Sequence, residues 1–322
     1  MTAWEDYLTK NQDRFIAELI EFTAIPSVSA KPENIADVRA AADWVAARLT
    51  AAGAEHAQVY PTAGHPVVCA DWLHAGPEKP TILIYGHFDV QPAEPFDLWT
   101  SPPFQPEIRD GKLWGRGASD DKGGMLIPIL TFESFLKTEG KLPVNVRFFF
   151  EGQEEIGSPD LPPFVAAHAD LLQADMIFSA DGLQWAPGQP QIVEALKGLV
   201  SLEITVQGPR GDQHSGMVGG GIANPALALA HILAGLRNEQ GLITVEGFYD
   251  DVIPLDADSR AALARVPYPD DQLLAETGAP APWGEPGYST QERIFARPTL
   301  DINGLTSGWQ GPGTKTVLPA LA

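Results

Sequence analysis

The chain has 322 residues, and 44% of them are hydrophobic, which is enough for a substantial core in one large or two ordinary domains. Asp and Glu number 42 against 21 Lys and Arg, so the formal net charge is −21. Because a surface this acidic repels nucleic acid and anionic membranes, we expect neither as a partner.

The start of the sequence lacks the basic, apolar and small-residue succession of a signal peptide, and no apolar run is long enough to span a bilayer. We therefore expect a cytoplasmic protein. Cys69 is the only cysteine, so the sequence predicts neither a disulfide framework nor a thiolate metal site. Its strand-like surroundings indicate a small core residue.

Hydrophobic periodicity predicts alternating helices and strands in the first part of the chain. The predicted helices span residues 3–23, 35–52, 125–136 and 163–172, and the predicted strands span residues 58–60, 67–72, 81–85, 145–150 and 175–179. The proline-rich stretch 97–111 is expected to be irregular. This alternation is typical of a three-layer α/β domain.

The pattern changes near Lys197. Residues 199–207 alternate like a half-buried strand, and Asn224-Pro225 opens an alanine-rich helix that extends to about residue 238. The stretch 253–286, rich in Pro, Asp and Ala, is predicted to lack regular structure. The expected organisation is an α/β domain over residues 1–196 followed by a smaller α/β domain over residues 197–322.

A histidine and an acid follow the predicted strand 81–85. His87 and Asp89 are two residues apart, so both side chains can point into the crevice at the carboxyl end of the sheet, where open α/β sheets bind ligands. His87 is therefore a candidate metal ligand and Asp89 its partner. A lone His-x-Asp pair is more often structural, so this interpretation depends on the rest of the chain.

Three further acidic sites follow strands or lie in glycine-rich turns. Asp120 lies among the glycines of residues 115–124, Glu154 and Glu155 follow the strand 145–150, and Asp181 follows the strand 175–179. Each alone is more often an ordinary turn or a solvated face. Together, one imidazole and several carboxylates suit Zn²⁺, Mn²⁺ or Co²⁺, and a shared carboxylate holds two ions roughly 3.5–4 Å apart.

Five motifs, which cover nearly the whole chain, together resemble the di-zinc peptidase family. That family contains cytosolic nonspecific dipeptidase, carnosinase, glutamate carboxypeptidase, acetylornithine deacetylase and succinyl-diaminopimelate desuccinylase. The motifs are Gly-His-Phe-Asp-Val-Gln-Pro (86–92), Gly-Arg-Gly-Ala-Ser-Asp-Asp-Lys-Gly (115–123), Glu-Gly-Gln-Glu-Glu-Ile-Gly-Ser (151–158), Asp-Gln-His-Ser-Gly (212–216) and Gly-Thr-Lys-Thr-Val-Leu-Pro (313–319). The resemblance implies a three-layer catalytic domain with a mixed sheet and a smaller α/β lid and dimerisation domain, incomplete in this chain.

The resemblance implies a role for each residue of the metal site. His87 would bind the first metal, Asp89 would orient its imidazole and Asp181 would complete that metal's ligands. Asp120 would bridge the two metals, and the peptide bond between Asp120 and Asp121 would be cis. Two divalent ions are expected, with zinc first and manganese or cobalt as alternatives.

The resemblance also implies a reaction. Glu155 would bind the second metal, and Glu154 would be the general base that takes a proton from a water between the metals. That water would attack the scissile carbonyl of a dipeptide or short peptide, and Glu154 would pass the proton to the leaving amine. Members that cleave dipeptides tend to have aspartate at the position of Asp181, which favours a dipeptidase.

Two residues of the smaller domain would act across a subunit interface. In the resembling dipeptidases the histidine at the position of His214 reaches into the neighbour's active site and stabilises the oxyanion, and Thr316 matches a residue that contacts substrate in the same way. We therefore expect a homodimer.

The sequence departs from the family in one respect. The family's second metal has a histidine ligand, and its substrate carboxylate an arginine, near the end of a longer chain. We therefore expect a truncated chain that binds one metal well and the second weakly, with little activity. The histidines outside any matching motif are His56, His65, His74, His168 and His231.

Two other functions stay open. The same metals could serve a deacylase or desuccinylase that acts on N-acyl amino acids. The chain could also be an inactive fragment or scaffold that lacks the second-metal histidine, although a scaffold does not require the retained set of ligands and base.

Overall fold

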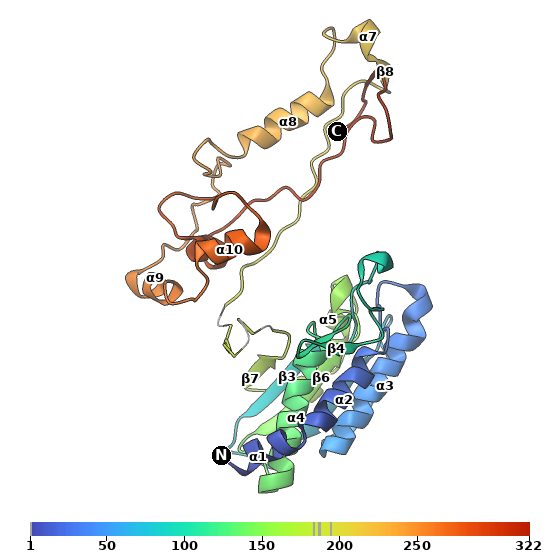
Figure 1. Ribbon diagram of the computed structural model, residues 1–322, viewed down its shortest axis with the longest axis vertical. Coiled ribbons are helices and arrows are strands. Elements are labelled where there is room, and N and C mark those ends of the chain that lie inside the picture. The colour runs from blue at the N-terminus through green and yellow to red at the C-terminus, as the bar shows by residue number, and fades with distance from the viewer. Residues whose placement is uncertain (1, 183, 186–187, 194) are drawn as a thin grey trace. The chain divides into compact units, whose positions relative to one another are not determined.

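The computed structural model describes residues 2–182, 184–185, 188–193 and 195–322 (Figure 1). The chain divides into two compact units, Met1–Ile192 and Val193–Ala322, which we call the first and the second unit.

The first unit alternates helices and strands. Its described helices are α1 (Ala3–Lys10), α2 (Gln12–Thr23), α3 (Ile35–Ala52), α4 (Lys122–Glu139), α5 (Leu161–Ala167) and α6 (Ala169–Leu172), with the short 3₁₀ turns η1 (Pro32–Asn34), η2 (Phe96–Leu98) and η3 (Glu154–Ile156). Its described strands are β1 (Glu55–Tyr60), β2 (Val67–Trp72), β3 (Thr81–His87), β4 (Glu107–Arg109), β5 (Lys112–Trp114), β6 (Asn145–Glu151) and β7 (Met176–Ser179).

Five of these strands form one sheet in the order β1-β2-β6-β3-β7. β2 is antiparallel to both β1 and β6, whereas β3 is parallel to both β6 and β7, so the predicted mixed sheet is confirmed. The carboxyl ends of the three parallel strands therefore meet at one edge. His87 lies beside Glu151 in register at that edge.

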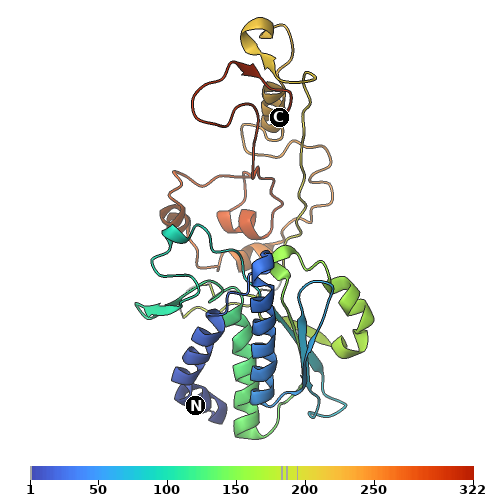
Figure 2. The same cartoon turned by 90° about the vertical axis from the view of Figure 1, so that its right-hand side faces the viewer.

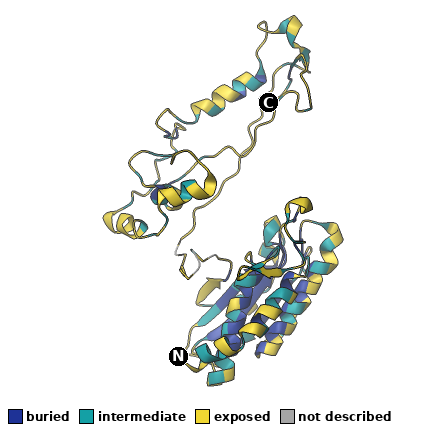
Figure 3. Cartoon of the chain, in the orientation of Figure 1, coloured by how far each residue is buried: buried dark blue, intermediate teal, exposed yellow. Residues whose placement is uncertain are grey.

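Side chains of the central strands alternate between two cores. Phe148 and Phe150 of β6 pack in the larger core with α3 and α4, whereas Phe149 packs in the smaller core with α5. Figure 3 shows the central strands of this unit buried beneath helices whose outer faces are exposed, whereas the edge strand β7 is exposed. The predicted three-layer α/β architecture is therefore confirmed, and Figure 2 shows the helices on the two sides of the sheet.

The helix predicted over residues 3–23 is two helices, because the chain breaks at Asn11. The Asn11 side chain donates from Nδ2 to the carbonyl oxygen of Tyr7 at 2.8 Å, and its backbone N–H donates to the same oxygen at 3.1 Å. Asparagine side chains compete for backbone groups in this way, which favours helix ends over helix interiors. The helix predicted over residues 163–172 likewise divides into α5 and α6, at His168.

A short hairpin interrupts the stretch 97–111, which the sequence analysis predicts to be irregular. β4 pairs with β5 through a two-residue turn at Asp110 and Gly111. Both turn residues have left-handed backbones, with φ of 50° and 72°. Asp-Gly is a preferred pair for such tight hairpin turns, so the signal was present in the sequence.

The second unit has shorter elements. They are β8 (Gln213–His214), α7 (Ser215–Val218), α8 (Pro225–Gly235), α9 (Ala257–Leu263), α10 (Asp270–Thr277), α11 (Thr290–Phe295) and β9 (Val317–Leu318). α8 begins as predicted, because Asn224 Oδ1 accepts a hydrogen bond from Ala226 N at 2.9 Å. Among the described residues of the whole chain, no helix has the length and apolar content needed to cross a bilayer.

Two predictions for the second unit are wrong. The strand predicted over residues 199–207 does not form: Leu199 and Leu202 are 96% and 84% exposed, and only the end of this segment, at residues 206–208, pairs, with residues 320–322. A strand forms only where a neighbouring strand pairs with it, and alternation of apolar and polar residues does not show whether such a neighbour exists. The stretch 253–286 does contain helices, because Asp256 caps α9 by accepting from Ser259 N at 2.7 Å.

Candidate metal centre

One edge of the sheet gathers the acidic sites that lie far apart in the sequence. β3 ends at His87, β6 ends at Glu151 just before the turn η3 with Glu154 and Glu155, and β7 ends two residues before Asp181. Because these three strands are parallel, their carboxyl ends bring the following residues to the same place. The structure therefore assembles the predicted ligands of the first unit in one site.

The imidazole of His87 lies at the centre of this site. It is buried, and its Nε2 atom lies 3.0 Å from Asp120 Oδ1, 3.9 Å from Glu154 Oε2 and 3.9 Å from Asp181 Oδ2. The carboxylates are more accessible, with side chains 62% exposed for Asp120 and 39% for both Glu154 and Asp181. The site thus has a buried imidazole nitrogen at its base and solvent-accessible carboxylates around it.

Asp89 holds both the imidazole and the glutamate turn. It is buried, and its Oδ1 atom lies 3.4 Å from His87 Nδ1. The same carboxylate accepts hydrogen bonds from the backbone N–H groups of Glu154 and Glu155, each at 3.1 Å. One buried carboxylate therefore fixes the ring of a candidate ligand, His87, and the backbone of the candidate base Glu154 and of the candidate ligand Glu155.

The loop before α4 brings Asp120 over His87. The peptide bond between Asp120 and Asp121 is cis, as the resemblance implies. Asp121 is buried and its Oδ2 accepts from the backbone N–H of His87 at 3.2 Å. A Cβ atom at Gly86 would lie 2.7 Å from Asp121 Oδ2, and one at Gly124 would lie 2.2 Å from Asp121 Oδ1, so both positions require glycine.

The donor atoms fit divalent metal ions. Ligand atoms of His87, Asp120 and Glu155 all lie within 4.8 Å of one another. Two ligand atoms that are each about 2.1 Å from a tetrahedral ion are about 3.4 Å apart, and the separations around His87 Nε2 lie on both sides of this value. An imidazole with carboxylates is also the donor set that zinc, manganese and cobalt accept.

The electrostatics of the site also favour bound cations. Burial opposes protonation of His87, but the carboxylate of Asp89 and then those of Asp121 and Glu154 outweigh it and raise the pKa of His87 to about 10. Burial raises the pKa of Glu154 and Glu155, and their carboxylate neighbours raise it further. Several negative charges therefore share one small site, which bound cations would stabilise.

Sequence reasoning missed three residues that shape the site. Asp121 supports the backbone of His87, and burial raises its pKa to about 7. Gln91 donates from Nε2 to Glu155 Oε2 at 2.8 Å and so orients that carboxylate. Glu151 is buried and accepts from Tyr85 Oη at 2.7 Å. All three lie inside the quoted motifs, and the glycines beside Asp121 were the available signal.

His214 and Thr316 lie together in the second unit. β8 and β9 are antiparallel, and His214 pairs with Val317, the residue after Thr316. The backbone N–H of Ser215 donates to Thr316 O at 3.3 Å. His214 Nδ1 accepts from Gly216 N at 3.1 Å, so Nε2 is the ring nitrogen that this hydrogen bond leaves available. Their predicted roles toward substrate stay predictions.

Comparison with known proteins identifies related sequences and structures. The family model for peptidase family M20/M25/M40 matches residues 83–292. A Cys-Gly metallodipeptidase of Schizosaccharomyces pombe is 32% identical over 98% of this chain and 68% of its own length. The Beta-Ala-His dipeptidase of Mus musculus is 32% identical over 97% of this chain and 66% of its own length.

A solved structure also resembles this chain. The M20 family metallo-carboxypeptidase Sso-CP2 from Sulfolobus solfataricus has a TM-score of 0.77 at 29% identity, and the match covers 95% of this chain and 69% of that one. The chain thus spans about two thirds of the length of the relatives that it matches.

Proposed function

The chain belongs to the M20/M25/M40 peptidase family, and we propose that it hydrolyses the peptide bond of dipeptides or short peptides with two divalent metal ions, zinc in the first instance. The observation that carries this proposal is the group of carboxylates around the buried imidazole of His87, whose separations of 3.0–3.9 Å suit metal coordination. His87 and Asp181 would hold one ion, Glu155 the other, and Asp120 both.

The metal ions supply Lewis-acid polarisation of the scissile carbonyl and lower the pKa of water. Within the chain, Glu154 would take the proton from the attacking water and deliver it to the leaving amine. Its backbone is fixed by Asp89, whereas its carboxylate is partly exposed and 3.9 Å from His87 Nε2. Burial and neighbouring carboxylates raise the pKa of Glu154, which makes it a better proton acceptor than an ordinary glutamate.

The relatives favour dipeptides as the substrate class. Two of them are named for the dipeptides Cys-Gly and β-Ala-His, and the resemblance associates the aspartate at position 181 with the dipeptidase branch. A panel should include dipeptides, a tripeptide, and N-acetyl and N-succinyl amino acids. We expect dipeptides to be hydrolysed at least about tenfold faster than the tripeptide and the N-acyl amino acids. Faster hydrolysis of the N-acyl compounds would instead assign the chain to the deacylases.

The second unit would complete the site from another copy of the chain. We propose that the chain forms a homodimer in which His214 stabilises the oxyanion and Thr316 contacts the substrate in the neighbour's site. The support is the adjacency of the two residues across β8 and β9. A cytoplasmic location stays a prediction from the sequence.

Replacement of the base tests the proposal. In zinc-loaded protein, Glu154→Gln should lower dipeptide hydrolysis by roughly 10²–10⁴-fold, which is the range for loss of a general base. Metal content, measured by elemental analysis, should not change, because Glu154 would not bind metal. Glu139→Gln, at an exposed position near the end of α4, is the matched control. Hydrolysis by Glu154→Gln at a rate near that of the unmodified protein would refute the assignment.

A further inference from the structure

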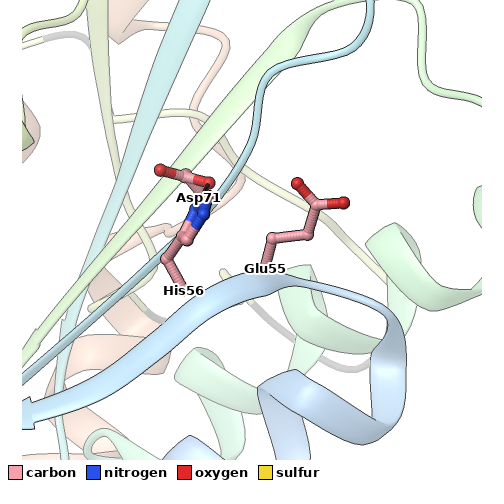
Figure 4. Close-up of side chains that lie close together, drawn as sticks. All are labelled: Glu55, His56 and Asp71. Carbon is pink, nitrogen blue, oxygen red and sulfur yellow. Dashed lines mark hydrogen bonds and ion pairs between the residues drawn. The ribbon is translucent and has the colours of Figure 1, made fainter.

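A second group of potential ligands lies at the other end of the sheet. Glu55 and His56 begin β1, and Asp71 lies on the neighbouring strand β2 (Figure 4). One ligand atom from each of these three residues lies within 4.8 Å of the other two. His56 Nδ1 is 2.9 Å from Asp71 Oδ1, and His74 Nε2 is 2.9 Å from Glu55 Oε2. Two imidazoles and two carboxylates therefore form one connected cluster.

An irregularity in β1 places Glu55 and His56 on the same side. Neighbouring side chains of a regular strand point to opposite faces. Here the pairing of β1 with β2 shifts register between Glu55 and Gln58, and His56 has a left-handed backbone with φ of 53°. This bulge turns the His56 ring toward Asp71, so that consecutive residues contribute to one cluster.

The cluster places two like charges opposite each other. Glu55 and Asp71 are register partners in the antiparallel pair. Like charges at such positions destabilise a sheet, and the chain as a whole is already at −21. The exposed fraction is 49% for the Glu55 side chain and 22% for that of Asp71, so neither charge is fully screened by water. A cation between the two carboxylates would remove the repulsion.

The positions of the two histidines are supported by their neighbours. His56 Nδ1 lies 2.9 Å from Asp71 Oδ1, so the ring is held beside that carboxylate. The His74 ring packs edge-on against Trp72, with centroids 5.4 Å apart and planes at 77°. The Trp72 contact thus holds His74 in place to orient the Glu55 carboxylate.

We propose that Glu55, His56 and Asp71 form a second metal site, which binds one divalent transition-metal ion with nitrogen and oxygen ligands, and that His74 orients Glu55. Zn²⁺, Ni²⁺ and Cu²⁺ accept this donor set, whereas Mg²⁺ and Ca²⁺ prefer oxygen alone. The orienting contact of His74 corresponds to the outer hydrogen bonds that fix ligands at other metal sites.

The second site is separate from the candidate catalytic centre. On β6, Asp71 pairs with Arg147, whereas His87 pairs with Glu151. The four intervening residue steps correspond to about 13 Å along the strand, and the two sites also lie on different strands. β1 is the edge strand of the sheet. An ion held by β1 and β2 would therefore fasten the exposed edge without taking part in hydrolysis.

Copper titration of the complete chain, with its catalytic centre first loaded with zinc, tests the proposal. Paramagnetic Cu²⁺ broadens the NMR signals of nearby histidine rings. We expect the ring signals of His56 and His74 to broaden at copper concentrations at least about tenfold below those that broaden His231, an exposed histidine of α8. Broadening of all three at the same concentration would overturn the proposal.

Variants of the cluster give a second measurement. His56→Asn keeps a residue that tolerates a left-handed backbone, and Glu55→Gln changes an exposed side chain without changing its shape. Each should weaken copper binding at this site by at least about tenfold, as loss of a ligand or its partner does elsewhere. His231→Gln should not. Unchanged copper affinity in both variants would mean that the cluster is only an ion pair of His56 with Asp71.

Discussion

In the first unit three of the four predicted metal ligands, His87, Glu155 and Asp181, lie at or just after the ends of strands of one sheet. In the second unit the predicted substrate-contacting residues, His214 and Thr316, lie at or next to a ladder of only two residue pairs. β3 and β6 lie between two hydrophobic cores and end at the metal centre. β8 and β9 pair over Gln213–His214 and Val317–Leu318 alone. Figure 3 shows the same contrast as buried central strands in the first unit and mostly exposed ribbon in the second.

The contrast shows what each unit can position by itself. Metal coordination needs side chains held within about half an ångström, which a packed sheet with supporting hydrogen bonds provides. The second unit has few buried hydrophobic residues, which among the described residues are Leu229, Ile243 and Leu318. Precise placement of His214 would then depend on contacts made when a partner and substrate bind. Five predictions test this division, in order of decreasing expected effect.

Removal of the shared ligand should have the largest effect. Asp120→Ala deletes the carboxylate 3.0 Å from His87 Nε2 that would serve both ions. Metal affinity should fall by more than the roughly 10–100-fold typical of a group that only orients a ligand, and hydrolysis should be lost with it. Elemental analysis after dialysis measures the bound metal. Retention of as much metal as the unmodified protein binds would show that Asp120 is not a ligand.

Removal of His214 from the second unit should lower the rate of hydrolysis but not the metal content. His214→Ala should lower kcat for dipeptides by about 10²–10³-fold, the range for loss of one oxyanion donor, while zinc stoichiometry stays unchanged. His231→Ala is the matched histidine control in the same unit. If His214→Ala lost zinc, His214 would belong to the metal ligands and the division between the units would fail.

A buried ion-pair network should contribute to the folding stability of the first unit. Glu133 is buried in α4 and accepts from Tyr7 Oη at 2.6 Å, and it also pairs with Arg14 and Arg48. Glu133→Gln leaves Arg14 and Arg48 with Glu18 as their remaining charge partner, and the loss of the charged hydrogen bonds should lower the free energy of unfolding by about 1–3 kcal/mol. Chemical denaturation followed by circular dichroism measures it, with Glu139→Gln as the exposed control.

The same glutamate predicts a pH dependence. Burial raises the pKa of Glu133, but its hydrogen bonds with Tyr7, Arg48 and Arg14 outweigh this and lower it. Because the folded-state pKa lies below the unfolded value of about 4.5, the pair stabilises the fold above that pH, and this contribution is lost as the pH falls through the folded-state value. The variant and the unmodified protein should therefore converge in stability toward low pH.

The residues that the structure gathers in the candidate metal centre could be predicted because five motifs together resemble one family, whereas each motif alone is more often structural. His87 and Asp89 are two residues apart after an apolar run, Glu154, Glu155 and Asp181 follow two further strands, and Asp120 lies in a glycine-rich turn. The supporting contacts could not be predicted, since the burial of Asp121 depends on the distant Gly86. The bulge at His56 and the opposition of Glu55 and Asp71 likewise depend on the register between two strands, which alternation alone does not set.

The second unit was harder to predict for a related reason. Residues 199–206 have the alternation of a strand, but strand formation depends on a partner, and the described residues pair with this segment only from Val206 onward. The composition of the stretch 253–286 predicts irregular structure, yet α9 and α10 form there. The Asp256 side chain caps α9, and acidic residues in the first turn of α10 stabilise its start. Composition is therefore a weaker guide than capping signals in this region.

Thiol reactivity tests the difference in packing between the two units and should show the smallest effect. Cys69 lies in the interior of β2, packed with Phe149 and Phe164, and burial raises the pKa of its thiol to about 12. At pH 8 the native protein should therefore react with iodoacetamide at least about a hundredfold more slowly than the unfolded chain. In Cys69→Ser, a new thiol from Ser201→Cys, at an exposed position of the unpaired stretch, should react nearly as fast as a free thiol.

The two rates separate local from global opening. If Cys69 reacts only when the whole first unit unfolds, its rate should rise with denaturant in parallel with the loss of the circular dichroism signal, and Glu133→Gln should accelerate it. The rate at position 201 should not respond to either change. Protection of the new thiol in the native protein would mean that residues 199–206 are covered in solution, for example by a second copy of the chain, and the second unit would then be better packed than its own residues provide.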